Sequence, residues 1–186
     1  MGRILLAAIA GAIAMFVAMS ILHMSPVSRI GFSQLADDGP ALAALKAGTA
    51  NRPGLYIYPT VDMQAKDAMA KSVAARAVKP SGIFVYEPPG TPGMSPRQLL
   101  TEFGIEFLQC LIAATLLSSA ALMTYFGRVG FVLLTGILAA LTTNASYWNW
   151  YGFPANYTLA NMGIEVASFF AAALVIAAFI RPRRLR

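Results

Sequence analysis

The stretch ILLAAIAGAIAMFVAMSIL, residues 4–22, runs for 19 residues without a charged side chain. The hydrocarbon core of a bilayer is about 30 Å thick, and a helix needs about 20 apolar residues to cross it. Three further apolar stretches follow in the C-terminal half, at 99–125, 129–147 and 158–180. We therefore expect an all-α membrane protein built as a bundle of four transmembrane helices.

The composition supports this class and excludes several others. Of the 186 residues, 58% are hydrophobic and 12% are charged, whereas soluble domains carry about 25% charged residues. Disordered chains are poor in apolar residues, so disorder is excluded as well. One cysteine (Cys110) and one histidine (His23) rule out an internal disulfide and every metal motif that needs two such ligands. No motif implies a cofactor, a metal site or a catalytic residue.

The expected organisation has six parts. Transmembrane helices are predicted at 1–24, 95–126, 127–147 and 158–186, the last ending in a basic cytoplasmic tail, with a small extracytoplasmic α+β segment at 25–94 and an aromatic outer loop at 148–157. The core of a signal peptide usually has about 7–15 residues, so we expect the first helix to be retained. Cleavage near Ala18-Met19-Ser20 is the alternative.

The arginines predict the orientation of the chain, because short loops rich in Lys and Arg stay in the cytoplasm. If the spans alternate, six arginines fall on one side: Arg3, Arg128, Arg181, Arg183, Arg184 and Arg186. The loop at 148–157 has no charge, so both termini are expected to be cytoplasmic. The net charge of +6 then reflects topology and contact with anionic lipid. Because no basic stripe with interleaved aromatics is present, we expect no nucleic-acid partner.

The outer segment contains two short runs with the composition of strands, 55–58 and 83–86, each following a glycine and ending near a proline. Between them we predict a helix over 62–78, with Asp62 as its N-cap and Pro80 as its stop. A shorter helix is predicted over 40–47. The connection allows either a right-handed parallel unit or an antiparallel pair. Two strands are marginally stable alone, so they should pack on the bundle or on a partner.

The sequence Ser95-Pro96-Arg97-Gln98 is typical of the beginning of a helix. A serine N-cap, a proline at the first helical position and a glutamine at the third form a capping box. The second membrane helix should therefore begin at Pro96.

Polar side chains gather near the predicted outer ends of the helices. Glu102, Glu106 and Gln109 share one face of the second helix, Asn161 and Glu165 share a face of the fourth, and His23 closes the first. Ionisable residues inside a span are costly, so each is a candidate functional residue. These groups could bind a cation, relay protons or hold the head group of an amphipathic ligand. The structural alternative is pairing, for instance of Glu102 with Arg97.

Six aromatic residues lie between Tyr147 and Thr158. Five form a candidate surface for a ligand or partner: Tyr147, Trp148, Trp150, Tyr151 and Tyr157. Amphipathic rings beside carboxylates suit a flat or cationic ligand. The alternative is an aromatic belt at the level of the lipid head groups.

Three motifs carry a resemblance to a known group: Leu55-Tyr56-Ile57-Tyr58-Pro59, Ser95 to Leu100, and Tyr147 to Pro154. Together they resemble a group of four-helix bacterial inner-membrane proteins that has no known activity. The resemblance would span most of the chain. It implies a location in the bacterial cytoplasmic membrane and assigns no role to any residue.

From these features we expect an integral membrane protein that acts as an accessory, assembly or partner- and lipid-binding subunit through its outer face. Its partners would be the bilayer and possible further membrane-protein subunits. The alternative is a small membrane enzyme or transporter that uses the outer carboxylate cluster. Against the alternative, the inner halves of the four helices carry no charge and so provide no polar path across.

Overall fold

The computed structural model describes residues 1–62 and 64–181. The chain forms two compact units, one from Met1–Phe32 together with the residues from Met94 onward, and the other from Ser33–Gly93. Each unit is described by itself below.

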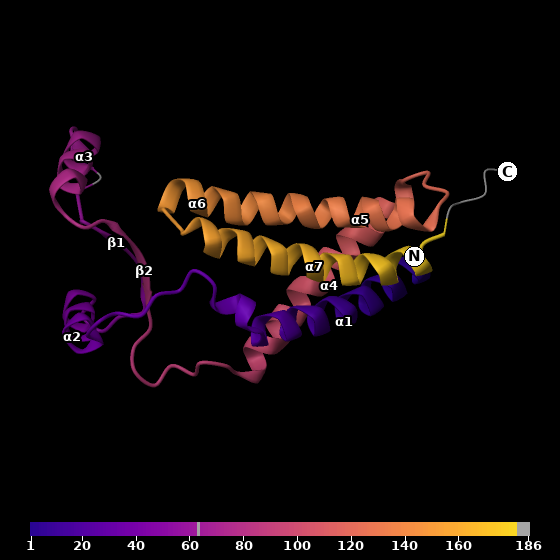
Figure 1. Cartoon of the computed structure of the whole chain (residues 1–186), viewed down its shortest axis with the longest axis horizontal. Coiled ribbons are helices and arrows are strands. Elements are labelled where there is room, and N and C mark those ends of the chain that lie inside the picture. Colours follow the sequence, from indigo (N-terminus) through magenta and orange to yellow (C-terminus); the bar gives the residue numbers. More distant parts are fainter. Residues whose placement is uncertain (63, 182–186) are drawn as a thin grey trace. The chain divides into compact units, whose positions relative to one another are not determined.

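The first unit consists mainly of long helices (Figure 1). They are α1 (Gly2–Met24), α4 (Pro96–Ser119), α5 (Tyr125–Ala140) and α7 (Ala155–Phe179). Through a π-helical turn at Leu141–Ala145, α5 continues into α6 (Ser146–Tyr151). Within the described residues, four helical stretches are therefore long and apolar enough to cross a membrane. This confirms the number of long apolar helices expected from the sequence.

The side chains on the outward faces of these helices are as apolar as the side chains buried between the helices. Large exposed side chains include Leu6, Leu100, Leu134 and Leu159, which are 58–73% exposed. The interior is instead filled by small residues such as Ala8, Ala12, Ala113, Ala114, Ala172 and Ala173. A helix that is hydrophobic all round is typical of a membrane span.

The small interior residues let the helix backbones approach closely. Helix α7 packs against both α1 and α5, and α1 also packs against α4. A Cβ atom added to Gly11 of α1 would lie 2.7 Å from Cγ1 of Ile176 in α7. Such close contacts let dispersion between the helices stabilise the bundle, and small residues at the contacts are typical of transmembrane helix packing.

The beginning of α4 agrees with the predicted serine N-cap and proline at the first position, but Gln98 does not complete the capping box, because its Oε1 accepts from the Ser95 hydroxyl and not from the Ser95 N–H. Oγ of Ser95 accepts a hydrogen bond from the backbone N–H of Gln98 at 3.3 Å, and Pro96 is the first helical residue. The end of this helix differs from the prediction of a span over 95–126. Helix α4 stops at Ser119, and α5 begins at Tyr125 because Oγ1 of Thr124 accepts from the N–H of Gly127 and caps a new helix.

The prediction of a loop over 148–157 is wrong, because most of these residues are helical. The third span continues as helix to Tyr151, and α7 begins at Ala155, so only Gly152–Pro154 connects them. Gly152 adopts φ +73°, the left-handed conformation with which helices commonly end. Pro154 at the N-cap then starts α7 earlier than the predicted Thr158. Tyr147, Trp148, Trp150 and Tyr151 thus belong to α6 and Tyr157 belongs to α7, while Phe153 lies in the connection.

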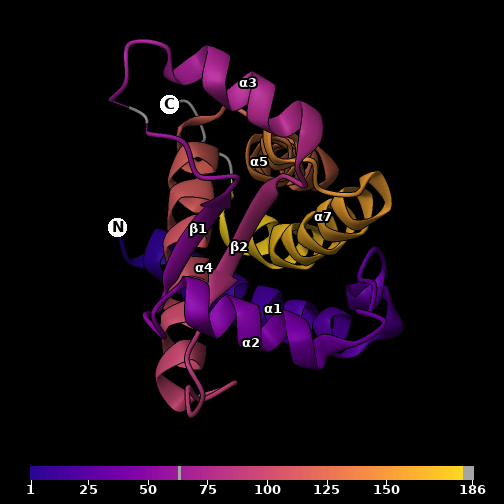
Figure 2. The ribbon, with the colours of Figure 1, turned by 90° about the vertical axis from the view of Figure 1, so that its left-hand side faces the viewer.

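The second unit contains α2 (Asp38–Gly48), β1 (Gly54–Tyr58), α3 (Ala68–Val78) and β2 (Gly82–Tyr86). The strands lie side by side and antiparallel, with Tyr56 opposite Phe84 (Figure 2), so the parallel alternative is excluded. The predicted helix over 62–78 begins only at Ala68. Asp62 does not cap it, because its Oδ1 accepts from the N–H of Gln64 in a preceding turn. The end of α3 before Pro80 agrees with the prediction.

The two faces of the hairpin differ, because side chains alternate along a strand. On one face Tyr56 stacks on Phe84 at 5.3 Å between ring centroids, and Oη of Tyr86 donates to Oδ1 of Asn51 at 2.8 Å. On the other face Leu55, Ile57 and Val85 are 68–72% exposed. Aromatic side chains of the hairpin thus pack on one face, and the apolar side chains of Leu55, Ile57 and Val85 on the other face stay exposed. Its packing on the bundle or on a partner stays a prediction.

Arg3 and Arg181 lie at the end of the bundle where Figure 1 places the N-terminus and the end of α7, whereas Arg29 follows α1 and Arg97 begins α4 at the opposite end. Arg3 and Arg181 line one cavity together with Ser118. Arg128 is not a free loop residue, because it is 8% exposed and hydrogen-bonds to the end of α7. The other predicted cytoplasmic arginines, at 183, 184 and 186, lie outside the described residues.

Candidate functional site

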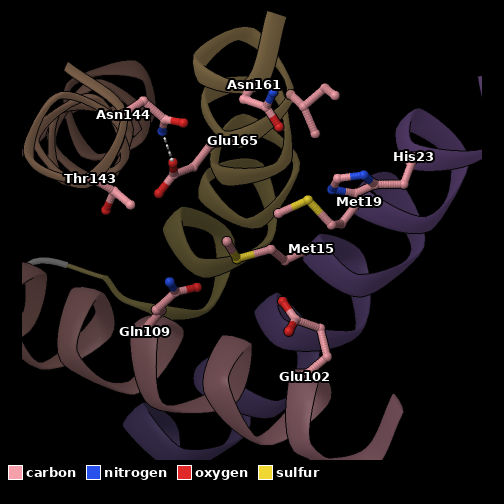
Figure 3. A pocket seen from close by; sticks show the side chains of 10 residues that line it. Met15, Met19, His23, Glu102, Gln109, Thr143, Asn144, Asn161 and Glu165 are labelled. Atoms are coloured by element: carbon pink, nitrogen blue, oxygen red, sulfur yellow. Dashed lines mark hydrogen bonds between the residues drawn. The ribbon is translucent and has the colours of Figure 1, made fainter. Parts of the chain in front are cut away.

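At the opposite end of the bundle, the four long helices enclose a cavity of about 290 Å³ (Figure 3). Its lining is mostly polar: Met15, Met19, His23, Glu102, Gln109, Thr143, Asn144, Asn161, Ile164 and Glu165. Every one of the four spans contributes at least one side chain. The cavity therefore exists only when all four helices are assembled.

Helices α1 and α4 supply their side chains by simple helical spacing. Met15, Met19 and His23 are four residues apart, so they follow one face of α1. Glu102 and Gln109 are two turns apart on α4. Because the Ser95 cap makes α4 begin at Pro96, Glu102 lies in its second turn, near the outer end.

A change of helix type brings the third span to the site. The π-helical turn at Leu141–Ala145 alters the direction in which the following side chains point, and such turns are frequent at functional sites. Within it, Nδ2 of Asn144 donates to Oε2 of Glu165 at 3.1 Å and to the carbonyl of Ala140 at 3.2 Å (Figure 3). The amide thus holds one oxygen of the Glu165 carboxylate in place.

Helix α7 presents Asn161 and Glu165 one turn apart. Nδ2 of Asn161 donates to the carbonyl of Tyr157 at 2.9 Å. One turn below Glu165, Ser168 is fully buried and its hydroxyl donates to the carbonyl of Ile164 at 2.9 Å. The polar lining ends there, and the apolar interior of the bundle begins.

The structure brings together five of the six residues of the predicted polar cluster: His23, Glu102, Gln109, Asn161 and Glu165. Glu106 is on the same face of α4 but does not line the cavity. It is 1% exposed, and within the described residues neither of its carboxylate oxygens has a hydrogen-bond partner. Ion pairing does not explain the acids, since among the described residues the one salt bridge joins Lys71 and Asp67 in the outer unit.

Replacement of Glu106 by methionine is expected to raise the stability of the protein. A buried polar group without a partner costs about 1–3 kcal/mol, and methionine fills a similar volume with a flexible apolar chain. The measurement is thermal unfolding in detergent. Glu102→Met, at an exposed position one turn away, is the matched control and should shift the free energy of unfolding by only about 0.5 kcal/mol. A Glu106 variant that fails to accumulate would show instead that this carboxylate stabilises the fold.

A second cavity, of about 280 Å³, shares Thr143 and Asn144 with the first. Its other lining residues are Tyr147, Phe153, Tyr157 and Thr158. Tyr147 stacks on Phe153 with ring centroids 5.7 Å apart. The hydroxyl of Thr158 is buried and has no hydrogen-bond partner within the described residues.

The predicted aromatic surface is therefore divided by the structure. Tyr147 and Tyr157 line the second cavity, whereas Trp148, Trp150 and Tyr151 are 51–75% exposed and do not. The outward group matches the position of an aromatic belt. Tyr147 and Tyr157 form the aromatic wall of the second cavity together with Phe153, although Tyr147 is itself 48% exposed.

Several lining residues escaped the sequence analysis. Met15 and Met19 were not among the predicted site residues, although their four-residue spacing with His23 places all three on one face of α1. Asn144 was not recognised as the partner of Glu165, because the π-helical turn has no reliable sequence signal. Phe153 was passed over for the larger tyrosines and tryptophans around it.

Within the described residues, no group of three or more His, Cys, Asp or Glu side chains could hold a metal ion. Cys110 is fully buried behind the lining residue Met15, with the two sulfur atoms 4.0 Å apart, and does not line the cavity itself. Comparison of the chain with protein-family models, with curated proteins and with solved structures finds no match in any of the three.

Proposed function

We propose that this chain is a multi-pass protein of the bacterial cytoplasmic membrane that binds the polar end of a lipid or a small polar solute in its outer cavity. In this proposal it acts without catalysis, as an accessory or assembly subunit of a larger complex. Both termini lie in the cytoplasm, and the cavity opens toward the outer leaflet.

The distribution of charge supports this orientation. Arg3, Arg128 and Arg181 belong to one end of the bundle, and Arg29 and Arg97 belong to the other, where the carboxylates Glu102 and Glu165 also lie. Arginines mark the cytoplasmic side of short loops. Reporter fusions at each terminus and at Gly152 test the orientation, and activity of a cytoplasmic reporter at Gly152 would contradict it.

The observation that carries the proposal is the polar cavity between four apolar helices. Pockets that bind small molecules are concave and present a few convergent polar groups. Here two carboxylates, three amides and a histidine converge in a bundle whose exterior is apolar. Polar groups at this depth are costly without a partner, so a bound ligand would explain their presence.

A transporter or proton path fits less well. Toward the cytoplasmic end, the space below the cavity is closed by an apolar cluster that includes Ala8, Ala12, Ala113, Leu117 and Ile176. Within the described residues these side chains are buried, and they provide no polar group to carry an ion. A cavity that is blocked by apolar side chains at its cytoplasmic end suits a binding site that opens only to the outer side.

The proposal is tested by extracting the protein under mild conditions and measuring its mass by native mass spectrometry. We expect a retained lipid or solute on the wild-type chain. The double variant Glu102→Gln, Glu165→Gln should lose it while remaining folded. Glu87→Gln, in the outer unit, is the matched control and should keep it. A bare wild-type monomer, or equal retention by the double variant, would overturn the proposal.

The accessory role has separate support in the outer unit. The exposed hairpin face of Leu55, Ile57 and Val85 is an apolar patch of the kind that marks protein contacts. A photoreactive side chain at Ile57 should give one defined cross-linked product in membranes, and the same group at Tyr56, on the opposite face, should not. Equal cross-linking from both positions would contradict a specific contact.

A further inference from the structure

We infer that the outer cavity takes a primary ammonium group, carried by an aminophospholipid or by a free amphipathic amine. The inference rests on the proposed function and names the chemistry of its ligand. It follows from the charge of the cavity, from the hydrogen-bonding atoms that remain free in it, and from the aromatic cavity beside it.

The charge of the lining favours a cation. Glu102 and Glu165 both line the cavity, and neither a lysine nor an arginine is among the lining residues. His23, the other ionisable lining residue, lies at the exposed end of α1. Opposite charges attract strongly in a low-dielectric site, whereas an anionic ligand would be repelled.

The buried lining atom that lacks a hydrogen-bond partner within the described residues is an acceptor, Oε1 of Gln109. Both donor bonds of Asn144 go to groups that accept, the Ala140 carbonyl and the Glu165 carboxylate, which leaves Oδ1 of Asn144 free. One N–H of the Asn161 amide donates to the carbonyl of Tyr157.

Acceptors beside the two carboxylates favour a cation that carries N–H donors over a cation that has none. A primary ammonium offers three N–H donors on a compact charge and can satisfy several acceptors at once. A quaternary ammonium has no donor and would leave Oε1 of Gln109 buried and unpaired, which is costly. The geometry therefore favours a primary amine over a choline-type group.

The second cavity supplies a place for the rest of the ligand. It shares Thr143 and Asn144 with the first and is walled by Tyr147, Phe153 and Tyr157. The rings of Phe153 and Tyr157 lie 5.4 Å apart. Thr158 is 6% exposed, and its unpartnered hydroxyl lines this cavity. A ligand would therefore place its ammonium group in the first cavity and an apolar portion in the second, where one polar atom of that portion can bond to the Thr158 hydroxyl.

Two arms of one experiment separate the two sources of the amine. The full-length protein is reconstituted in nanodiscs of phosphatidylcholine, and binding of tyramine and of its N,N,N-trimethyl derivative is measured by titration calorimetry. In the lipid arm, native mass spectrometry compares retention of phosphatidylethanolamine with that of phosphatidylcholine from an equal mixture. Each pair differs in the N–H donors and keeps the positive charge.

We expect the primary amine to bind about tenfold or more tightly than its quaternary partner in at least one arm, the size of one hydrogen bond to a charged group. Glu165→Gln should weaken that binding by a similar factor, and Glu87→Gln should not change it. Thr158→Val should weaken binding of tyramine and leave binding of 2-phenylethylamine, which lacks the hydroxyl, unchanged.

The contrary outcomes separate the two proposals. Equal or tighter binding of the quaternary compounds, or retention of an anionic lipid that Glu165→Gln abolishes, would overturn the ammonium assignment and leave a binding site in place. Absence of any bound or retained compound in both arms would overturn the proposed function together with the assignment. The comparison between amines uses the wild-type protein, so it does not depend on how a variant folds.

Discussion

Replacement of Gly136 by leucine is expected to prevent α5 from packing against α7, and so to remove the folded four-helix unit. Gly136 is buried in α5, and a Cβ atom added there would overlap Cβ and Cγ of Phe169 in α7. Phe169 is itself 3% exposed, so its ring has no free space to move into. Alanine is the milder test, and overpacking of this kind costs about 1–3 kcal/mol.

The matched control lies on the same helix. A Cβ atom added to Gly130 meets nothing within 4 Å, so Gly130→Ala should gain about 0.5–1 kcal/mol from helix propensity alone. Accumulation in membranes and thermal unfolding in mild detergent would be measured for all three variants. If Gly136→Ala proved as stable as Gly130→Ala, the close approach of α5 and α7 would be wrong.

Replacement of Arg128 by methionine should produce the second large effect. Its Nε donates to the carbonyl of Ala177 in the last turn of α7, and Nη1 donates to the carbonyl of Met123 before α5, both at 3.1 Å. Hydrogen bonds from charged groups contribute about 1.5–3 kcal/mol each, and a cation also favours the C-terminal end of a helix. We expect a loss of about 3 kcal/mol or more in the free energy of unfolding.

Arg128→Lys separates the effect of the two guanidinium hydrogen bonds on stability from the effect of the positive charge on orientation. Lysine keeps the positive charge that orients the chain but lacks the planar fork that reaches two carbonyls. The lysine variant should therefore insert with unchanged orientation and still lose part of the stability. Equal stability of the lysine and wild-type proteins would show that charge alone matters here. A methionine variant as stable as the wild type would show that neither hydrogen bond stabilises the bundle.

Features with a local cause were predictable from the sequence. The four apolar stretches follow from the length that a helix needs, and Ser95-Pro96 starts a helix through contacts with its own next turn. The sequence spacing also places Met15, Met19 and His23 on one helix face, but it does not show that this face lines a cavity. Boundaries failed where a single side chain decided them, as with the Thr124 cap and with Asp62, which bonds within a turn and caps no helix.

The candidate site was predicted as a set of polar residues and not as a geometry. The sequence could place Glu102, Glu165 and Asn161 at one end of the bundle, because depth in a helix depends only on residue count. It could not show that Asn144 holds Glu165, since this contact joins residues 21 positions apart through a π-helical turn. Nor could it separate Tyr147 and Tyr157 from the outward tryptophans.

By itself the sequence determined the number of apolar helices, the end at which each polar group lies, and the asymmetry of the arginines, because all three follow from local spacing. Only the tertiary structure decided which groups meet. Glu102 and Glu106 share one helix face, yet Glu102 lines the cavity and Glu106 is buried without a partner. The physical reason is that the environment of a side chain depends on the helices that cross its own, and those crossings are set by small residues such as Gly11 and Gly136 far away in the chain.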